Sequence, residues 1–393
     1  MDSGSFNLDE YLKEAKLEQF KKNSESWEIQ ESSKKLQYFT HGFFRFFGKF
    51  PPPIASKFID EYFDKTDEII LDPMVGSGTT LVESNLRNFD AIGTDVNELC
   101  VMISKAKTTY IPPKKIHDCI QSFQKFSRNK IHDLEKFIPN DKFLEHWFFK
   151  KNINQLGNIR QFIEKQASDE NLSNLLKVGL ASIIRNVSRA SKGMGRMFLD
   201  PALEEVDVYQ MFNDKIMKYF EVMNNWECKK KSQKIYLRNA KNLPIKDSTI
   251  GLTICHPPYY NLYKYSSIFK FEMLWTGVNY LGTKTDEIFE GFKMGNIEGV
   301  QKYIFDMEII LNEIKRVLKK RRYCVLMIGD AVIKNTRVNT TSSLLKKVNG
   351  FEVEKIIVRI PKFTEASYAA AQRRSKSDVG INMPDHLVIL KKL

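Results

Sequence analysis

The segment that most constrains this chain is a short apolar run that ends in two prolines and two tyrosines. Residues 251–255, Gly-Leu-Thr-Ile-Cys, follow a polar turn at 246–249 and predict a buried strand of a parallel sheet. Residues 256–260, His-Pro-Pro-Tyr-Tyr, then lie at the carboxyl end of that strand, where open α/β sheets bind ligands. The prolines fix φ and lack N–H groups, so the carbonyl groups here are rigid acceptors. Beside an aromatic face, such acceptors suit a planar ring with an exocyclic amine. The alternative is a strand terminator with two packing tyrosines.

A second pattern begins with a strand that runs into a glycine-rich turn. Residues 67–80 read Asp-Glu-Ile-Ile-Leu-Asp-Pro-Met-Val-Gly-Ser-Gly-Thr-Thr, and a helix is expected to follow them. Gly76 and Gly78 allow the backbone to approach a ligand and to present N–H groups at the start of that helix. The next expected strand ends in Asp95, at the position of an acid that binds ribose hydroxyls. Leu81 replaces the third glycine of the dinucleotide fingerprint, and no Gly-Lys-Ser/Thr follows, so NAD and ATP are disfavoured.

Together these segments resemble the S-adenosylmethionine-dependent amino-methyltransferases, which methylate the exocyclic nitrogen of adenine or cytosine in DNA. DPMVGSGTT is similar to that family's cofactor loop, and HPPY is similar to its catalytic motif. Residues 41–52 look like its H-x-Y-x-x-KFPP segment, which closes over the methionine end of the cofactor. Residues 238–244 look like a third motif, usually G-D-A-x-x-L-P, so Asn239 would face the adenine of the cofactor. The resemblance covers residues 38–110 and 234–393.

The resemblance implies two sets of site residues and no metal. The implied catalytic residues are His256, Pro257, Pro258 and Tyr259. The implied residues for binding S-adenosylmethionine are Lys49, Phe50, Pro51, Asp72, Met74, Gly76, Ser77, Gly78, Thr79, Thr80, Asp95, Val96, Asn239 and Ala240.

His256 departs from the family pattern, which usually has Asp here in adenine enzymes and often Ser in cytosine-N4 enzymes. A neutral imidazole can accept one hydrogen bond from a substrate amine, whereas an imidazolium can only donate. Three interpretations stay open. His256 accepts from the amine, or it shapes the turn and leaves acceptance to the Pro257 carbonyl, or the protein binds cofactor and DNA without efficient turnover.

The function implied by the resemblance is direct methyl transfer to an exocyclic amino nitrogen. Tyr259 would stack on a base that has first been flipped from the duplex. Cytosine N4 is favoured narrowly over adenine N6, because the GSGTT and KFPP segments resemble the SPPY enzymes more than the DPPY enzymes. RNA amino-methylation and a binding protein without turnover are the other candidate functions.

Composition agrees with a nucleic-acid partner. The chain has 61 Lys and Arg against 48 Asp and Glu, a net charge of +13, and a basic surface attracts phosphates. Double-stranded DNA is the expected partner, and a cognate restriction endonuclease is a further candidate.

Five scattered cysteines form no CxxC pair, which indicates reduced thiols in a cytoplasm rather than disulfides or a zinc site. No signal peptide and no apolar run of membrane-spanning length is visible, so we expect a soluble protein without a membrane partner.

The expected fold is α/β, a doubly wound, mostly parallel, seven-stranded methyltransferase sheet with a helical insertion. We expect an N-terminal helical extension at 1–37, a cofactor-binding half at 38–113, and a catalytic half at 233–393. Residues 114–232 repeat apolar side chains at helical spacing and predict the inserted module, which is the candidate for target recognition.

Two basic segments are candidates for DNA contact. The residues expected to touch DNA are Arg185, Arg189, Lys192 and Arg196 in the insertion, and Arg373 and Arg374 near the C-terminus. The alternative for both segments is a solvated basic loop. The sequence predicts neither the recognised DNA site nor the oligomeric state.

Overall fold

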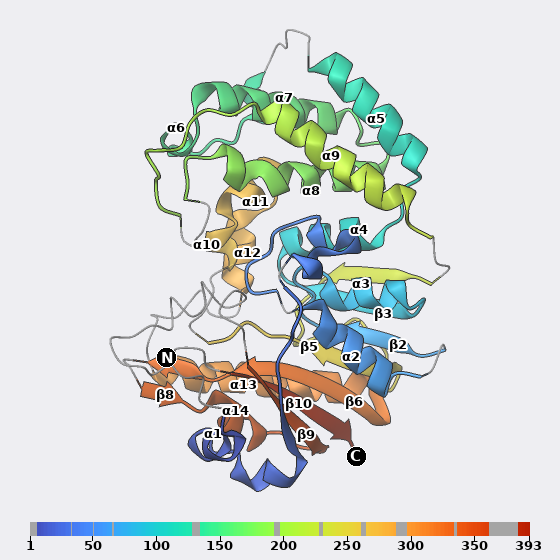
Figure 1. The fold of residues 1–393 in the computed structure, drawn as a ribbon, viewed down its shortest axis with the longest axis vertical. Coiled ribbons are helices and arrows are strands. Elements are labelled where there is room, and N and C mark those ends of the chain that lie inside the picture. Colours follow the sequence, from blue (N-terminus) through green and yellow to red (C-terminus); the bar gives the residue numbers. More distant parts are fainter. Residues whose placement is uncertain are drawn as a thin grey trace.

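A helical layer lies on one side of a large twisted sheet (Figure 1). The computed structural model describes residues 6–393 except 33, 50, 65–66, 128–133, 192–196, 228–230, 261–264, 288–296, 334–335 and 361–383. No helix in the described part of the chain combines the length and the apolar character needed to cross a membrane.

The main sheet has eight strands in the order β1-β9-β10-β6-β5-β2-β3-β4. β10 is antiparallel to β6 and β9, and the other neighbouring strands run parallel. The doubly wound, mostly parallel α/β fold is therefore confirmed. The strands are β1 (Ser24–Trp27), β2 (Ile69–Asp72), β3 (Asp90–Asp95), β4 (Gln233–Leu237), β5 (Ile250–Cys255), β6 (Leu318–Gly329), β9 (Phe351–Arg359) and β10 (Asp385–Lys392). A separate antiparallel pair joins β7 (Ala331–Ile333) to β8 (Thr336–Val338).

The expected count of seven strands was wrong by one, because β1 adds an eighth strand at the edge. Residues 1–37, which include β1, were expected to form a helical extension, and the described part does contain α1 (Leu8–Glu14) and a 3-10 helix (Glu18–Asn23). Ser-Glu-Ser-Trp lacks the apolar alternation that predicts a strand. Its parallel pairing with β9 uses main-chain groups, which leave no trace in the side-chain pattern.

Two apolar cores cover the two faces of the sheet. On one face, Ile254 of β5 belongs to a cluster with residues of α2 (Pro52–Tyr62) and α3 (Thr79–Leu86). On the other face, Cys255 belongs to a cluster with α1, α13 (Ile297–Val317) and α14 (Thr340–Leu345). Neighbouring residues of β5 therefore point to opposite faces, and both faces are buried, which explains why the strand reads as a continuous apolar run.

The helical layer is built from two stretches of chain. The stretch between β3 and β4 supplies α4 (Glu98–Thr108), α5 (Pro113–Phe126), α6 (Leu144–Trp147), α7 (Lys150–Glu164), α8 (Glu170–Val187) and α9 (Val208–Asn224). The stretch after β5 supplies α10 (Tyr265–Ile268), α11 (Lys270–Thr276) and α12 (Tyr280–Asp286). A single buried cluster contains residues of both stretches, and α11 packs against α8 (Figure 1).

The strand order reverses direction between β2 and β5. The chain goes from β2 to β3 and β4 on one side, and from β5 to β6 on the other. Open α/β sheets bind ligands in the crevice at the carboxyl ends of strands where this reversal occurs. The glycine turn after β2 and the prolines after β5 both lie at that edge.

Candidate functional site

The glycine turn between β2 and α3 uses backbone conformations that favour glycine. Gly76 has φ +48° and Gly78 has φ +81°, and Gly78 is the N-terminal cap of α3. A Cβ atom on Gly78 would lie 3.0 Å from the Ser104 Oγ and 3.2 Å from the Ser104 Cα. The turn can therefore pass close to α4 only because residue 78 has no side chain.

Asp95, at the end of β3, ties this turn to the neighbouring strand. Its Oδ2 accepts the Gly76 N–H at 2.9 Å, and its Oδ1 accepts the Asn97 N–H at 2.9 Å. Burial raises the pKa of Asp95 to about 6, against the effect of these backbone donors. The carboxylate is therefore largely ionised at neutral pH.

Asp72, the last residue of β2, also holds the glycine turn in place. Its Oδ1 accepts the Met74 N–H at 3.1 Å, and burial raises its pKa to about 7. Asp72 does not line the pocket described next, so its position in the structure is that of a support for the turn.

One pocket brings the two sequence patterns together at the switch point of the sheet. It encloses about 970 Å³, open solvent at its mouth included. Of the expected cofactor residues, the pocket is lined by Lys49, Met74, Gly76, Ser77, Thr79, Asp95, Val96, Asn239 and Ala240. Pro51, Asp72, Gly78 and Thr80 do not line it, and Phe50 lies outside the described residues. His256 and Pro258 line the same pocket, whereas Pro257 and Tyr259 do not.

The imidazole of His256 is neutral at physiological pH. Burial lowers its pKa to about 4, and Asp385 and Arg359 act on it in opposite directions. A neutral imidazole has one nitrogen that accepts a hydrogen bond. His256 can therefore act as an acceptor in this pocket.

Tyr259 packs edge-on against His256, with ring centroids 5.3 Å apart and an interplanar angle of 88°. Its side chain is only 7% exposed and belongs to the core cluster that contains α2 residues. A base could stack on this ring only after the ring or its cover has moved. The stacking role of Tyr259 stays a prediction.

Lys49 reaches the pocket from the segment before α2. Its Nζ donates to the His41 carbonyl at 3.2 Å and to the Gln37 Oε1 at 3.4 Å. Burial lowers the pKa of Lys49 to about 8. Lys107 of α4 is fully buried nearby, where it donates to the Ser77 carbonyl at 2.9 Å and has a pKa well below its ordinary value because of burial.

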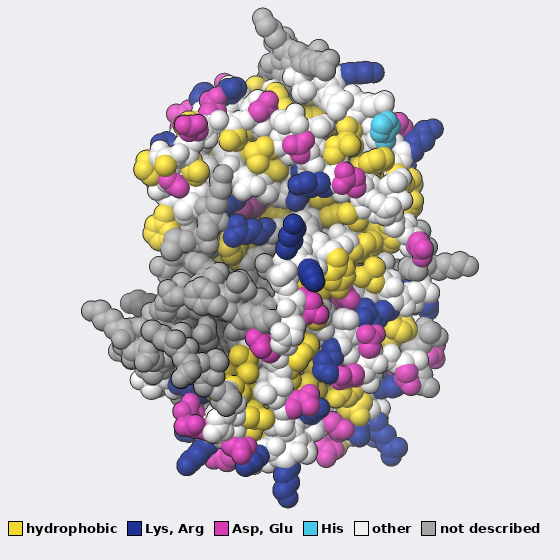
Figure 2. All heavy atoms as spheres, viewed as in Figure 1, with side chains coloured by type: hydrophobic (Ala, Val, Ile, Leu, Met, Phe, Trp, Pro, Cys, Tyr) yellow, Lys and Arg dark blue, Asp and Glu magenta, His cyan; other side chains and the backbone are white. Residues whose placement is uncertain are grey.

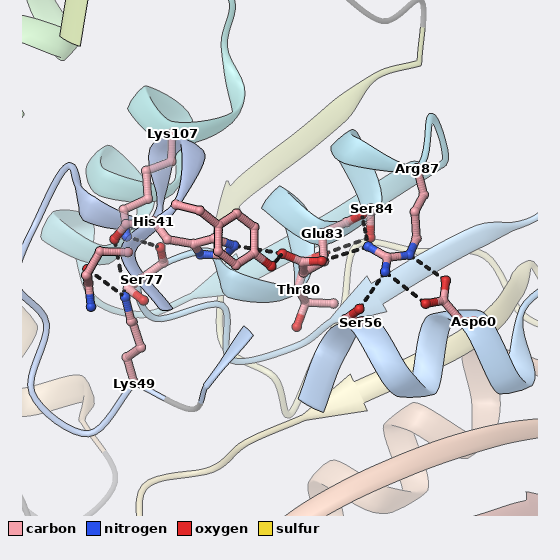
Figure 3. A network of polar contacts seen from close by, with 12 residues as sticks. His41, Lys49, Ser56, Asp60, Ser77, Thr80, Glu83, Ser84, Arg87 and Lys107 are labelled. Carbon is pink, nitrogen blue, oxygen red and sulfur yellow. Dashed lines mark hydrogen bonds and ion pairs between the residues drawn. The ribbon is translucent and has the colours of Figure 1, made fainter. Parts of the chain in front are cut away.

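A buried polar network holds the segment that carries Lys49 against α3 (Figure 3). Glu83 is its centre: Oε1 interacts with His41 Nε2 at 2.8 Å and accepts the Tyr38 hydroxyl at 2.5 Å. Its Oε2 accepts from Arg87 at 2.7 Å, and Arg87 in turn donates to Asp60 of α2 at 2.6 Å. Burial lowers the pKa of His41 to about 4, so a neutral ring donates to an ionised Glu83.

The sequence reasoning did not identify several residues of the site. Glu83 and Arg87 carry a local signal, since Glu83 lies in α3 and Arg87, four residues later, is the C-cap of that helix. Phe46, Asn97, Cys100, Arg238, Tyr265, Asp286 and Glu287 also line the pocket and were not expected. Phe46 and Arg238 lie within the segments 41–52 and 238–244 that resemble family motifs, and Asn97 follows the expected Asp95 and Val96. Cys100, Tyr265, Asp286 and Glu287 are marked by no local pattern.

The residues expected to contact DNA are only partly described. Arg189 donates to the His146 carbonyl at 3.3 Å and lies 5.2 Å from the Phe149 ring centroid, so it packs against the helical layer. Arg185 lies in the last turn of α8. Several Lys and Arg side chains gather in the middle of one face, where the helical layer meets the sheet (Figure 2). Lys192, Arg196, Arg373 and Arg374 lie outside the described residues, and DNA contact stays a prediction.

Cysteine and metal chemistry gain no support from the described residues. Cys100, Cys119, Cys255 and Cys324 are free and buried. Within the described ranges, no group of three or more His, Cys, Asp or Glu side chains could hold a metal ion.

Comparison with known proteins points to one enzyme class. Residues 5–106 match the family model described as DNA methylase. Over 378 aligned residues the chain is 23% identical to the Type II methyltransferase M.MvaI of Kocuria varians, covering 79% of this chain and 82% of that protein. Over 146 residues it is 29% identical to the Type II methyltransferase M.MjaII of Methanocaldococcus jannaschii, covering 36% of this chain and 27% of that protein. Among solved structures, the rRNA methyltransferase aviRa of Streptomyces viridochromogenes aligns with a TM-score of 0.37 at 9% identity, covering 92% of this chain and 94% of that one.

Replacing Gly78 by Ala should loosen the turn and weaken cofactor binding. The left-handed backbone costs about 1 kcal/mol for alanine, and the contact with Ser104 adds about 1–2 kcal/mol. Gly277→Ala is a matched control, because Gly277 has φ +79° but its Cβ would meet only a side-chain nitrogen of Arg160 at 3.7 Å. Calorimetry with S-adenosylhomocysteine should show about tenfold weaker binding for Gly78→Ala and unchanged binding for Gly277→Ala. Equal effects of the two substitutions would refute the steric role of the turn.

The neutral state of His41 should make the stability of the protein depend on pH. A pKa lowered from 6.5 to about 4 gives stability that is complete above pH 6.5 and is lost progressively as the pH falls toward 4. The difference in the free energy of unfolding between wild type and His41→Gln should therefore shrink by about 2 kcal/mol between pH 7 and pH 5. Titrating groups that do not interact with His41 act equally in both proteins and cancel in this difference.

Urea unfolding at the two pH values measures the effect of His41. His146→Gln is the control, since the His146 side chain is exposed and its curve should run parallel to that of the wild type. A difference for His41→Gln that does not change with pH would contradict the buried, neutral imidazole.

Proposed function

We propose that this chain is an S-adenosylmethionine-dependent DNA amino-methyltransferase that methylates an exocyclic amino nitrogen of a flipped base in double-stranded DNA, with cytosine N4 favoured over adenine N6. The match of residues 5–106 to the DNA methylase family model and the similarity to M.MvaI support this proposal. The preference for cytosine is supported by the GSGTT and KFPP segments, which resemble those of the SPPY enzymes. Adenine N6 is the second candidate target. RNA amino-methylation and cofactor and DNA binding without turnover remain the further candidate functions.

The observation that carries this proposal is the shared pocket. His256 and Pro258 follow β5, Asp95 ends β3, and the glycine turn follows β2, yet all of them line one cavity. A base held beside His256 would therefore lie next to a ligand held by Asp95 and the turn. This proximity is what a direct transfer between two bound ligands needs.

The residues of the pocket fit S-adenosylmethionine. Asp95 can accept hydrogen bonds from ribose hydroxyls, and the N–H groups at the start of α3 and the amine of Lys49 suit the carboxylate end of the ligand. Asn239 lines the pocket and offers an amide for the adenine ring. When bound, S-adenosylmethionine supplies a methyl group on a positively charged sulfonium.

The residues after β5 would prepare the amine for attack. An exocyclic amine is a poor nucleophile, because its lone pair is delocalised into the ring. We propose that His256 and the Pro257 carbonyl accept hydrogen bonds from the N–H groups of this amine. These hydrogen bonds would localise the lone pair on the nitrogen atom. The neutral imidazole permits this role, and the low pKa of His256 means that the ring still accepts hydrogen bonds at mildly acidic pH.

Two further proposals concern the contact with DNA and a partner protein. We propose that the helical layer and its basic segments contact the duplex, which the net charge of +13 supports. Two relatives are named Type II methyltransferases, which makes a cognate restriction endonuclease a candidate partner of this chain.

A labelled-methyl assay tests the proposed function. Wild-type protein is incubated with methyl-labelled S-adenosylmethionine and either duplex DNA or total RNA, and labelled DNA is digested to nucleosides. We expect label in DNA, on N4-methylcytosine. Label on N6-methyladenine would show that adenine, and not cytosine, is the target base. Label in RNA alone would refute DNA as the substrate. Cofactor binding without methyl transfer would refute the enzymatic function.

The dependence of kcat on pH tests the acceptor role of His256. At saturating cofactor and DNA, kcat should stay level from pH 8 to pH 5, because the imidazole protonates only near pH 4. KM for the cofactor should rise below about pH 6, where Asp95 takes up a proton. His256→Ala should lower kcat by about 100-fold or more. An unaffected His256→Ala would remove His256 from the acceptor role, and a kcat that halves near pH 6.5 would contradict the lowered pKa of His256.

A further inference from the structure

Three short helices connect the pocket with the helical layer. α10, α11 and α12 follow the His-Pro-Pro-Tyr-Tyr segment in the chain, and α11 packs against α8 (Figure 1). The same helices reach the pocket through Tyr265, Asp286 and Glu287. They therefore contact both the cofactor pocket and the helix that carries Arg185, one of the residues expected to bind DNA.

Glu287, directly after α12, joins two separate segments through one carboxylate. Its Oε1 accepts from the Asn97 side-chain amide at 3.1 Å. Its Oε2 accepts from the Ser266 N–H at 3.1 Å and from the Ser266 hydroxyl at 2.9 Å. Three donors from the loop after β3 and from α10 thus converge on this side chain.

Both partners of Glu287 lie next to functional parts of the site. The Asn97 N–H donates to Asp95, the expected ribose-binding acid, and the Asn97 Oδ1 accepts the Leu99 N–H at 3.0 Å as the cap of α4. Asn97 and Ser266 are both buried. Ser266 belongs to α10, the first helix after the base-holding residues 256–260.

Two further contacts keep these helices in place at each end. The Tyr265 ring stacks on Phe46, with centroids 5.4 Å apart and an interplanar angle of 21°, and Phe46 also lines the pocket. At the other end, Glu272 of α11 is buried and lies within electrostatic range of Arg185 on α8. The three helices therefore contact the pocket at one end and α8 at the other.

We propose that Glu287 is a positioning residue that couples cofactor binding to DNA binding. It holds α10, and with it the base-holding segment, against the loop that carries Asp95 and Asn97. A ligand that orders one side of this contact favours the ordered state of the other, so each ligand raises the affinity for the other by the same factor. The inference rests on the DNA binding in the proposed function and not on methyl transfer.

Binding measurements without turnover test this coupling. Calorimetry gives the dissociation constant of S-adenosylhomocysteine with and without saturating sheared genomic DNA, a probe that requires no knowledge of the recognition sequence. We expect DNA to tighten the binding by about tenfold in the wild type. In Glu287→Gln that factor should fall below half of the wild-type factor, because an amide nitrogen would face one of the three donors.

Controls separate coupling from general damage to the fold. Thr285→Ala alters an exposed residue of α12 whose hydroxyl donates to the Leu281 carbonyl within the helix, and it should keep the wild-type factor. Circular dichroism checks that each variant is folded. If Glu287→Gln does not fold, Ser266→Ala, which removes a single hydroxyl donor, decides by the same criterion.

The outcomes are distinct. A factor retained at half or more of the wild-type value, or a wild type in which DNA does not tighten cofactor binding, overturns the proposal. A wild type that shows the coupling but transfers no methyl group refutes the proposed enzymatic function and leaves the coupling intact.

Discussion

The paired hydrogen bonds of Asp95 hold together the two strand ends on which the site depends. One oxygen accepts from Gly76 in the turn after β2, and the other accepts from Asn97 in the loop after β3. The turn can sit there only because Gly78 has no side chain to meet Ser104. Through Asn97 the same carboxylate is connected to Glu287, and so to the helices that follow the base-holding segment. The pocket is therefore one connected unit, although its walls come from distant parts of the chain.

Burial decides the charge of the groups around this unit. It lowers the pKa of His256 and of His41 to about 4, so both rings are neutral in a strongly basic protein. His41 then serves as a structural donor to Glu83, whereas His256 lines the pocket, where an acceptor is needed. The same physical effect thus gives two histidines different roles, and their positions at the network and at the switch point determine which role each has.

The parts of the site that could be predicted from the sequence are those with a local signal. The strand, glycine turn and helix around Gly78, and the proline stop after β5, are each specified by adjacent residues. β1 escaped prediction because its polar residues pair through the backbone with a strand near the other end of the chain. Glu287 was not predicted as a site residue, because its contacts depend on how α10 and α12 pack, which no spacing in the sequence reveals. The contacts with DNA stay predictions for a related reason, since they depend on how the helical layer meets the duplex.

The central claim is that a neutral imidazole at residue 256 shares the cofactor pocket and can accept a hydrogen bond there. Nuclear magnetic resonance titration of the protein with isotope-labelled histidine measures this property directly, with His256→Gln used to assign the resonance. The account predicts that the ring of His256 titrates near pH 4. A pKa at or above the ordinary value of about 6.5 would contradict it, because the ring would then be substantially charged under the conditions in which an acceptor is required.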